Sequence, residues 1–269
     1  MNIFQIILIQ PLTNGLVVFY NLLFHNMGLA IIAFSIFLRL VLNPLTKPYM
    51  DSMKKMRDLA PELAKLKERH KDDKQGLMKA QADFYKSKGI NPTAGCLPYL
   101  LQIVVLIALY NVFTTVLTNQ VDVLQKLNEL LYDPLKFADS AILNTKFLYL
   151  DITKPDIFNV VGLPIPLPGP ILLLAAIVQM ISAKMMGPYV EAEKKVARKT
   201  ETKEDDMAAA MQGSAIYTMP LITIVIGVQF ASGLALYWLV FSAYQVVQQY
   251  ISGGWGGLTP WVRKIWKKN

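Results

Sequence analysis

Long stretches without charge constrain this chain more than any other feature of its sequence. No Asp, Glu, Lys or Arg occurs in residues 1–38, and further uncharged stretches cover residues 89–118, 157–183 and 207–262. A helix needs about 20 mostly apolar residues to cross the ~30 Å hydrocarbon core of a bilayer. The sequence therefore predicts an all-α polytopic membrane protein with five transmembrane helices, at residues 27–46, 93–117, 169–187, 214–230 and 233–251.

The N-terminal segment, residues 1–26, does not follow this pattern cleanly. It lacks the basic start of a targeting peptide, and Pro11 to Gly15 separate its two apolar pieces. We expect an interfacial helix lying on the outer face of the membrane. A sixth membrane-embedded helix is the alternative.

The basic residues indicate how the helices are oriented. Lys and Arg number 12 in residues 47–92, four in residues 118–168, six in residues 184–213 and four in residues 253–269. Because cytoplasmic loops are enriched in Lys and Arg, the N-terminus is predicted outside and the C-terminus in the cytosol. The net charge of +8 then indicates orientation and contact with anionic lipids. The sequence contains no stripe of basic residues interleaved with aromatic ones, so it does not point to binding of a specific nucleic acid.

The segments between the spans differ in character. Residues 47–92 are expected to form a cytosolic helical hairpin whose first apolar stripe begins with Met50, Met53 and Met56. This hairpin is either a solvated spacer or a surface that receives substrate chains, since methionine adapts to varied apolar partners. The outer loop, residues 118–168, shows no site chemistry, and the cytosolic loop, residues 188–213, carries mixed charge. The basic cytosolic tail, residues 252–269, suits lipid anchoring or a ribosome contact.

Arg39 is the only ionised side chain before Lys47, and it lies inside the first predicted span. A central arginine costs at least about 2.5 kcal/mol to insert, so it usually faces a watery cavity or a partner. Ser35, Arg39 and Asn43 share one helix face, while Gln102, Gln179 and Ser182 lie in the inner halves of other spans. Polar groups gathered in one leaflet predict a hydrophilic groove that is open to the cytosol and closed toward the outside. The alternative for Arg39 is an interfacial residue that snorkels to the headgroups.

The sequence lacks the residues that several classes of function require. All 19 Asp and Glu residues fall outside the predicted spans, which disfavours an ion-coupled transporter. His25 and His70 are far apart in sequence, and Cys96 is the single cysteine, which is expected to be a packing residue. The sequence has no glycine-rich phosphate loop. We therefore predict no enzymatic activity, no metal and no cofactor.

Four sequence strings carry a family resemblance. They are IFLRLVLNPL at residues 36–45, KGINPTAGCLP at residues 88–98 with Leu101 and Gln102 after it, FLYLD at residues 147–151, and LALYW at residues 234–238. In this order they resemble the YidC-type membrane protein insertases of the YidC/Oxa/Alb family. The chain looks like the short bacterial form, which lacks the large periplasmic domain.

The resemblance implies a site and a function. Arg39, Gln102 and Trp238 are implied to line the groove, with Ser35, Asn43, Gln179, Ser182 and Tyr237 as further candidates. The implied function is that of an insertase and chaperone of the bacterial inner membrane, which moves short polar tails and hydrophobic spans of nascent proteins from the cytosol into the membrane. Its partners would be nascent membrane proteins, with the Sec translocon, the signal recognition particle system and the ribosome as further candidates.

Two alternative functions stay open from the sequence. One is an assembly chaperone that acts only with the Sec translocon, and it shares every sequence feature of an insertase. The other is a small-anion transporter in which Arg39 binds the solute. For Trp238 and Tyr237 the alternative role is that of an aromatic anchor at the outer membrane surface.

Overall fold

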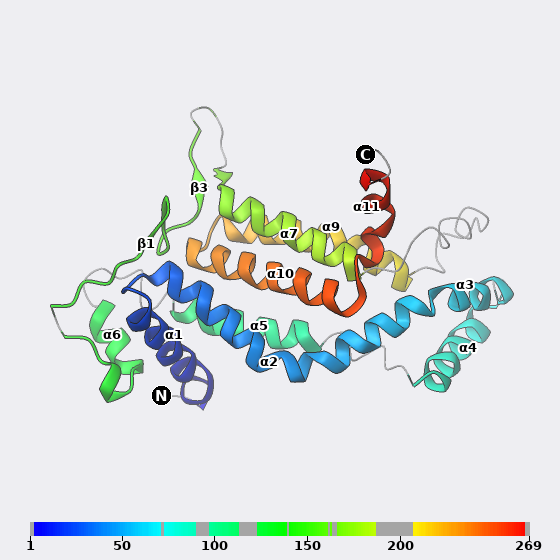
Figure 1. The fold of residues 1–269 in the computed structure, drawn as a ribbon, viewed down its shortest axis with the longest axis horizontal. Coiled ribbons are helices and arrows are strands. Elements are labelled where there is room, and N and C mark those ends of the chain that lie inside the picture. Colours follow the sequence, from blue (N-terminus) through cyan, green and yellow to red (C-terminus); the bar gives the residue numbers. More distant parts are fainter. Residues whose placement is uncertain are drawn as a thin grey trace. The chain divides into compact units, whose positions relative to one another are not determined.

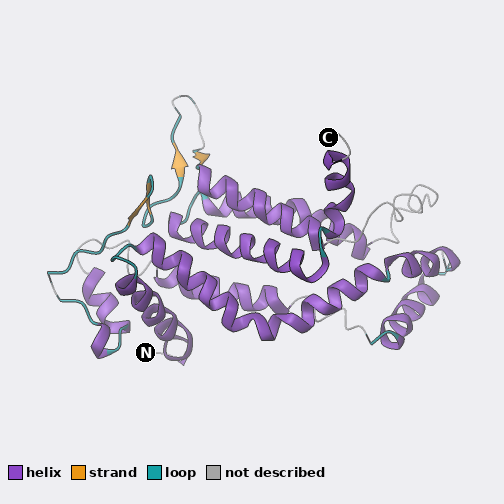
Figure 2. Ribbon diagram, viewed as in Figure 1, coloured by secondary structure: helices purple, strands orange, loops and turns teal. Residues whose placement is uncertain are grey.

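The computed structural model describes residues 3–70, 73–89, 97–112, 123–138, 140–160, 162, 166–186 and 207–266. This part of the chain is mostly helical (Figures 1 and 2). Five helices overlap the predicted spans: α2 (Met27–Asp58), α5 (Leu97–Asn111), α7 (Pro170–Met186), α9 (Met207–Gly227) and α10 (Ser232–Gly253). The predicted helical character is thus confirmed over the residues of these five helices.

Two helical stretches of the described residues are long and apolar enough to cross a membrane. They are Gln5–Leu22 and Met27–Pro48, and Pro170–Met186 and Ile216–Gly227 are shorter apolar helices. The first stretch joins η1 (Gln5–Ile9) to α1 (Gln10–Leu22) as one run of helix. It satisfies the length that a membrane-embedded N-terminal helix needs.

The chain divides into two compact units. The first comprises Met1–Leu42, Leu100–Val178 and Pro220–Tyr244, and the second comprises Asn43–Tyr99, Gln179–Met219 and Gln245–Asn269. Helices α2, α5, α7, α9 and α10 each contribute residues to both units.

The core of the first unit is built around helix α1. Leu16, Val17 and Tyr20 are almost fully buried there, together with Ala30 of α2 and Ala108 of α5. The opposite side of the N-terminal helix exposes large apolar side chains, among them Ile3, Ile7 and Leu22. A helix with one face in the core and one apolar face exposed is suited to lipid contact, either within or along the membrane.

Polar side chains tie helix α1 to the outer loop. The Asn14 amide donates to the Leu130 carbonyl oxygen at 2.8 Å and accepts from the Tyr132 amide at 2.7 Å. Leu130 ends helix α6 (Val123–Leu130), and η4 (Asp133–Leu135) follows it. These bonds satisfy backbone groups at the end of α6 that the helix cannot pair itself.

The outer loop also holds two small ladders that the sequence did not predict. Strand β1 (Lys146–Phe147) pairs with β2 (Leu150–Asp151), and β3 (Ile157–Phe158) pairs with β4 (Leu167–Pro168), both antiparallel (Figure 2). The segment between the ladders bonds to the start of α10, where the Ser232 amide donates to the Lys154 carbonyl oxygen at 2.7 Å. Two-residue strands have no detectable alternation, so no sequence period could reveal them.

In the second unit, the hairpin predicted over residues 47–92 consists of the C-terminal part of α2, α3 (Ala60–Arg69) and α4 (Lys74–Ser87). Helix α2 passes without interruption through Pro44 and Pro48, so no helix end marks the predicted inner limit of the first span. The Asp73 carboxylate caps α4 by accepting from the Gly76 amide at 2.9 Å. In the same unit, α10 is followed by η5 (Gly256–Leu258) and α11 (Thr259–Trp266).

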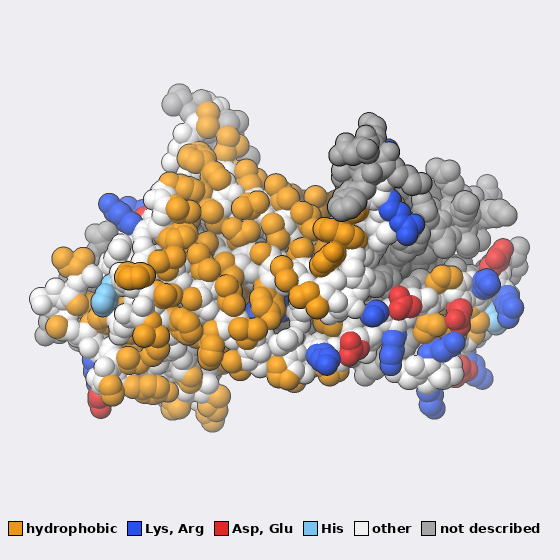
Figure 3. All heavy atoms as spheres, in the orientation of Figure 1, with side chains coloured by type: hydrophobic (Ala, Val, Ile, Leu, Met, Phe, Trp, Pro, Cys, Tyr) orange, Lys and Arg blue, Asp and Glu red, His pale blue; other side chains and the backbone are white. Residues whose placement is uncertain are grey.

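Side-chain chemistry differs sharply between elements. Hydrophobic side chains predominate over α7 and α10, whereas Lys, Arg, Asp and Glu gather over α3 and α4 (Figure 3). Exposed apolar residues on α5, α7, α9 and α10 include Ile107, Leu174, Leu221 and Ile251. Exposed apolar surface on this scale is typical of a protein that contacts lipid.

Candidate functional site

Arg39 lies on helix α2 and is buried, with 8% of its surface exposed. Its guanidinium carbon lies 3.4 Å from the ring centroid of Phe241 and 5.7 Å from that of Tyr244, both on α10. The Nη2 atom donates to the Phe241 carbonyl oxygen at 3.4 Å, which is long for a hydrogen bond. Arg39 is thus held by aromatic rings of the first unit.

The charge of Arg39 has no acidic counterpart in the part of the chain that the structure describes. No Asp or Glu among those residues forms an ion pair with it, and its Nε atom is buried without a hydrogen-bond acceptor there. A buried guanidinium with an unpaired donor is costly, because the desolvation of the charge is not offset by a partner. Such a group favours the approach of an anion.

The other predicted groove residues of the first unit have different surroundings. The Ser35 hydroxyl donates to the Ile31 carbonyl oxygen of its own helix, and the side chain is 3% exposed. Tyr237 is buried in the hydrophobic core, with its ring 5.9 Å from that of Phe241, and Trp238 packs against the same core while partly buried. The side chain of Gln102 lies outside the described residues.

Phe241 and Tyr244 are not among the residues predicted for the site. They follow Tyr237 at positions i+4 and i+7 of one helix, so the three rings share a face of α10. This aromatic spacing was the available signal. The pairing with Arg39 across 202 positions of sequence was not accessible, because no local pattern encodes it.

Predicted groove residues of the second unit form side-chain pairs. The Gln248 amide donates to the Asn43 side-chain oxygen at 2.6 Å, and the Gln249 amide donates to the Ser182 hydroxyl at 3.2 Å. The Gln249 Oε1 atom is buried with no donor among the described residues. Gln179 is partly buried and also has an interaction partner. Polar residues of separate helices are therefore brought together here.

The predicted hairpin methionines are placed in part. Met50 is buried and lines a cavity of about 30 Å³ with Lys54, Met185, Met186, Gln249, Ser252 and Gly253. That volume is roughly the share of one water molecule in the liquid, so the cavity as it stands does not hold a polypeptide. Met56 is half-buried, and the side chain of Met53 lies outside the described residues.

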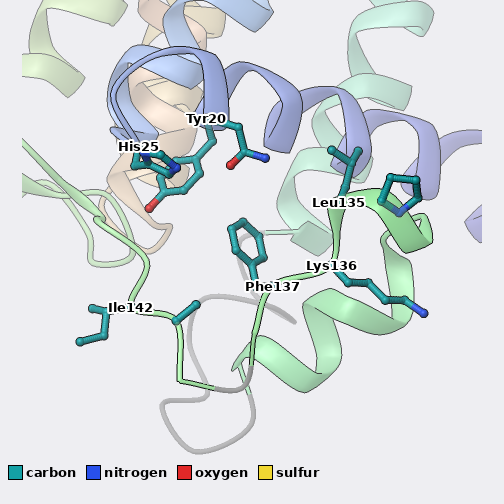
Figure 4. A pocket seen from close by; sticks show the side chains of 9 residues that line it. Tyr20, His25, Leu135, Lys136, Phe137 and Ile142 are labelled. Carbon is teal, nitrogen blue, oxygen red and sulfur yellow. The ribbon is translucent and has the colours of Figure 1, made fainter.

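A larger cavity, of about 300 Å³, lies in the first unit and is lined by Tyr20, Asn21, His25, Pro134, Leu135, Lys136, Phe137, Ala141 and Ile142. Figure 4 shows Phe137 pointing toward Tyr20, while the Lys136 amine points away from Tyr20 and His25. Lys136 instead pairs with Asp133 at 2.7 Å, and this hydrogen bond lowers the pKa of the Asp133 carboxyl. The polar groups of this cavity therefore do not converge on one point.

Comparison with known proteins places the chain among membrane insertases. The sequence matches the family described as 60Kd inner membrane protein over residues 18–254. A membrane protein insertase YidC from Pelagibacter ubique (strain HTCC1062) is 35% identical over 249 residues, which cover 92% of this chain and 39% of that protein. One from Fusobacterium nucleatum subsp. nucleatum is 32% identical over 225 residues, covering 84% and 85%. One from Ruegeria sp. (strain TM1040) is 30% identical over 244 residues, covering 89% and 36%.

The chain spans less than two fifths of the Pelagibacter and Ruegeria proteins and most of the Fusobacterium protein. These matches confirm the predicted resemblance. The family description names an inner membrane protein, and the relatives are named as insertases. Neither names a class of enzyme. The chain belongs to the family of YidC-type membrane insertases, described as 60Kd inner membrane protein.

Proposed function

We propose that this chain is a membrane protein insertase and chaperone. It moves short polar tails and hydrophobic spans of nascent proteins from the cytosol into the inner membrane through a hydrophilic groove that contains Arg39. In this proposal five helices span the membrane, with the N-terminus outside and the C-terminus in the cytosol. The loops rich in Lys and Arg then face the cytosol.

The observation that carries the proposal is the buried charge of Arg39. It lies within Met27–Pro48, a helical stretch that is long and apolar enough to cross a membrane. It is 8% exposed, and no carboxylate of the described residues pairs with it. Intramembrane charges of this kind are expensive and mark pathways through the membrane.

The mechanism follows from the properties of that charge. An acidic or polar tail enters from the cytosol and is attracted by the guanidinium, and charge pairs are stronger there than in water because the effective dielectric constant is lower. The groove shortens the polar path that the tail must cross. Partition of the substrate's apolar helix into lipid supplies about 0.3–0.6 kcal/mol per Leu, Ile, Phe or Val on the insertion scale. No nucleotide is required.

Partners follow from the same proposal. The hairpin that includes α3 and α4 meets the nascent chain, with Met50, Met53 and Met56 offering adaptable apolar contacts. The Sec translocon, the signal recognition particle system and the ribosome deliver substrates, and anionic lipids contact the basic segments.

The test is insertion into liposomes that contain this chain and no other protein. Single-span substrates with an acidic or a neutral tail are synthesised in the presence of wild type, Arg39→Ala and Arg39→Glu. We expect both variants to impair the acidic-tail substrate most, with Arg39→Glu the more severe because it repels the tail. Lys47→Ala is the matched control, since Lys47 lies on the same helix and is exposed.

Each contrary outcome has a distinct meaning. Equal efficiency of wild type and both Arg39 variants on the two tails contradicts the attraction by Arg39. Insertion that requires added translocon identifies an assembly chaperone instead. Solute flux without insertion of any substrate identifies a transporter.

A further inference from the structure

Arg39 has no acidic partner among the described residues, so other contacts hold its guanidinium in position. Phe241 covers one face of the guanidinium at 3.4 Å, close enough for a strong cation–π contact. The ring quadrupole attracts the cation, but it does not neutralise the charge as a carboxylate would.

The same contact leaves the hydrogen-bond donors of Arg39 to other partners. A ring that stacks on the guanidinium contacts its face and does not use the N–H donors, which lie in the plane. The Nε donor has no acceptor in the described part of the chain, and the bond from Nη2 to the Phe241 carbonyl oxygen is long. Carboxylates bind guanidinium groups in this plane, through parallel N–H···O bonds.

We infer that Phe241 is a positioning residue that holds Arg39 by its face and presents its edge to a carboxylate of the substrate tail. The inference rests on the proposed function and adds to it a determinant of specificity for acidic tails. Tyr244, whose ring centroid lies 5.7 Å from the guanidinium, is too far to take over the stacking without moving.

Tyr237, which also lies on α10, is less suited than Phe241 to hold the guanidinium of Arg39. Tyr237 contacts Phe241 at 5.9 Å between ring centroids and is itself 3% exposed. It supports the position of Phe241 from the core side. Phe241 thus lies between the core, which includes Tyr237, and the guanidinium of Arg39.

The experiment compares the ratio of acidic-tail to neutral-tail insertion in the protein-only liposomes. Phe241→Leu removes the π system while keeping an apolar side chain, and Phe241→Tyr keeps the ring. We expect Phe241→Leu to lower the ratio about threefold to thirtyfold, the range that a cation–π contact spans between exposed and desolvated sites. Phe241→Tyr should keep the ratio near that of wild type.

The effect of Phe241→Leu is compared between the wild-type and the Arg39→Gln backgrounds, and a variant at another aromatic pair is the control. In an Arg39→Gln background, Phe241→Leu should cause no further change, because the charge that it positions is gone. Phe230→Leu removes the aromatic contact with Tyr110, at 4.9 Å between ring centroids, and should leave the ratio unchanged. Thermal unfolding in detergent verifies that each variant is folded.

The results that overturn the inference differ from those that overturn the proposed function. If Arg39→Gln lowers the ratio but Phe241→Leu does not, Phe241 has no positioning role. The same conclusion holds if Phe241→Leu has an equal effect with and without Arg39, or lowers insertion of both tails alike. If Arg39→Gln itself leaves the ratio unchanged, the attraction by Arg39 fails first.

Discussion

Polar side chains inside an apolar environment are informative because they pair in only a few ways. Asn43 and Gln248 come from helices α2 and α10 and share a hydrogen bond of 2.6 Å. Ser182 and Gln249 share another, at 3.2 Å. Hydrogen bonds between membrane helices average about 0.6 kcal/mol, because the unfolded chain in the membrane also finds partners.

This leads to a prediction for the Asn43–Gln248 pair. Asn43→Ala and Gln248→Ala should each lower the stability of the protein in detergent, and the double variant should show a coupling of about 0.6 kcal/mol. The measurement is a double-mutant cycle on the free energy of unfolding. Asn43→Ala with Gln249→Ala is the control cycle, and its coupling should be zero since Gln249 bonds to Ser182. Equal coupling in both cycles would contradict the pairing.

The sequence predicted some of these residues and not others. Arg39 and Asn43 stand out because a charge or an amide in an apolar run is visible at once. Phe241 does not stand out, because an aromatic residue in a membrane helix is common and its role depends on a contact with another helix. Composition reveals an unusual residue, whereas only the fold reveals its partner.

At the scale of elements, the outer loop anchors helix α7. The Asp156 carboxylate accepts from the Leu172 amide at 2.9 Å and from the Tyr149 hydroxyl at 3.1 Å, and that hydroxyl in turn accepts from the Ile171 amide. Burial raises the pKa of Tyr149, as does the neighbouring Asp156, so the hydroxyl stays a donor. A side chain on Gly169 would collide with the same carboxylate. The anchor therefore needs Asp156 and a glycine together.

Loss of Asp156 should accordingly weaken this end of α7. We expect Asp156→Ala to destabilise the protein by about 1–3 kcal/mol, because it removes a helix cap and leaves the buried Leu172 amide without its acceptor. Unfolding in detergent measures the effect. Asp133→Ala is the control, since that carboxylate is exposed and its ion pair among the described residues is with Lys136. A loss of similar size for both variants would show that Asp156 is not the anchor.

The helices themselves were largely predictable, and the loop structure was not. Residues 169–187 and 233–251 were expected as spans, and α7 (Pro170–Met186) and α10 (Ser232–Gly253) fall on them closely, because apolar length is a local property of the sequence. The structure of the outer loop includes contacts such as the hydrogen bond from the Ser232 amide to the Lys154 carbonyl oxygen. Such contacts join segments that are distant in sequence.

At the scale of the whole molecule, the distribution of charge predicts a topology that labelling can test. In a Cys96→Ser background, Ala138→Cys and Lys79→Cys each introduce one exposed thiol, in the outer loop and in α4. A membrane-impermeant maleimide should label residue 138 in intact cells and residue 79 only after the membrane is opened. The reverse pattern would invert the proposed orientation.

Arg39 also has a consequence for how the protein responds to voltage. A unit charge that crosses a polarised bilayer changes its energy by about 2.3 kcal/mol per 100 mV. In a cell that is negative inside, an acidic tail that leaves Arg39 for the exterior moves down the electrical gradient, whereas a basic tail moves against it. In the proposed mechanism, Arg39 therefore works together with the resting potential, which helps to release acidic tails outward and gives export a direction.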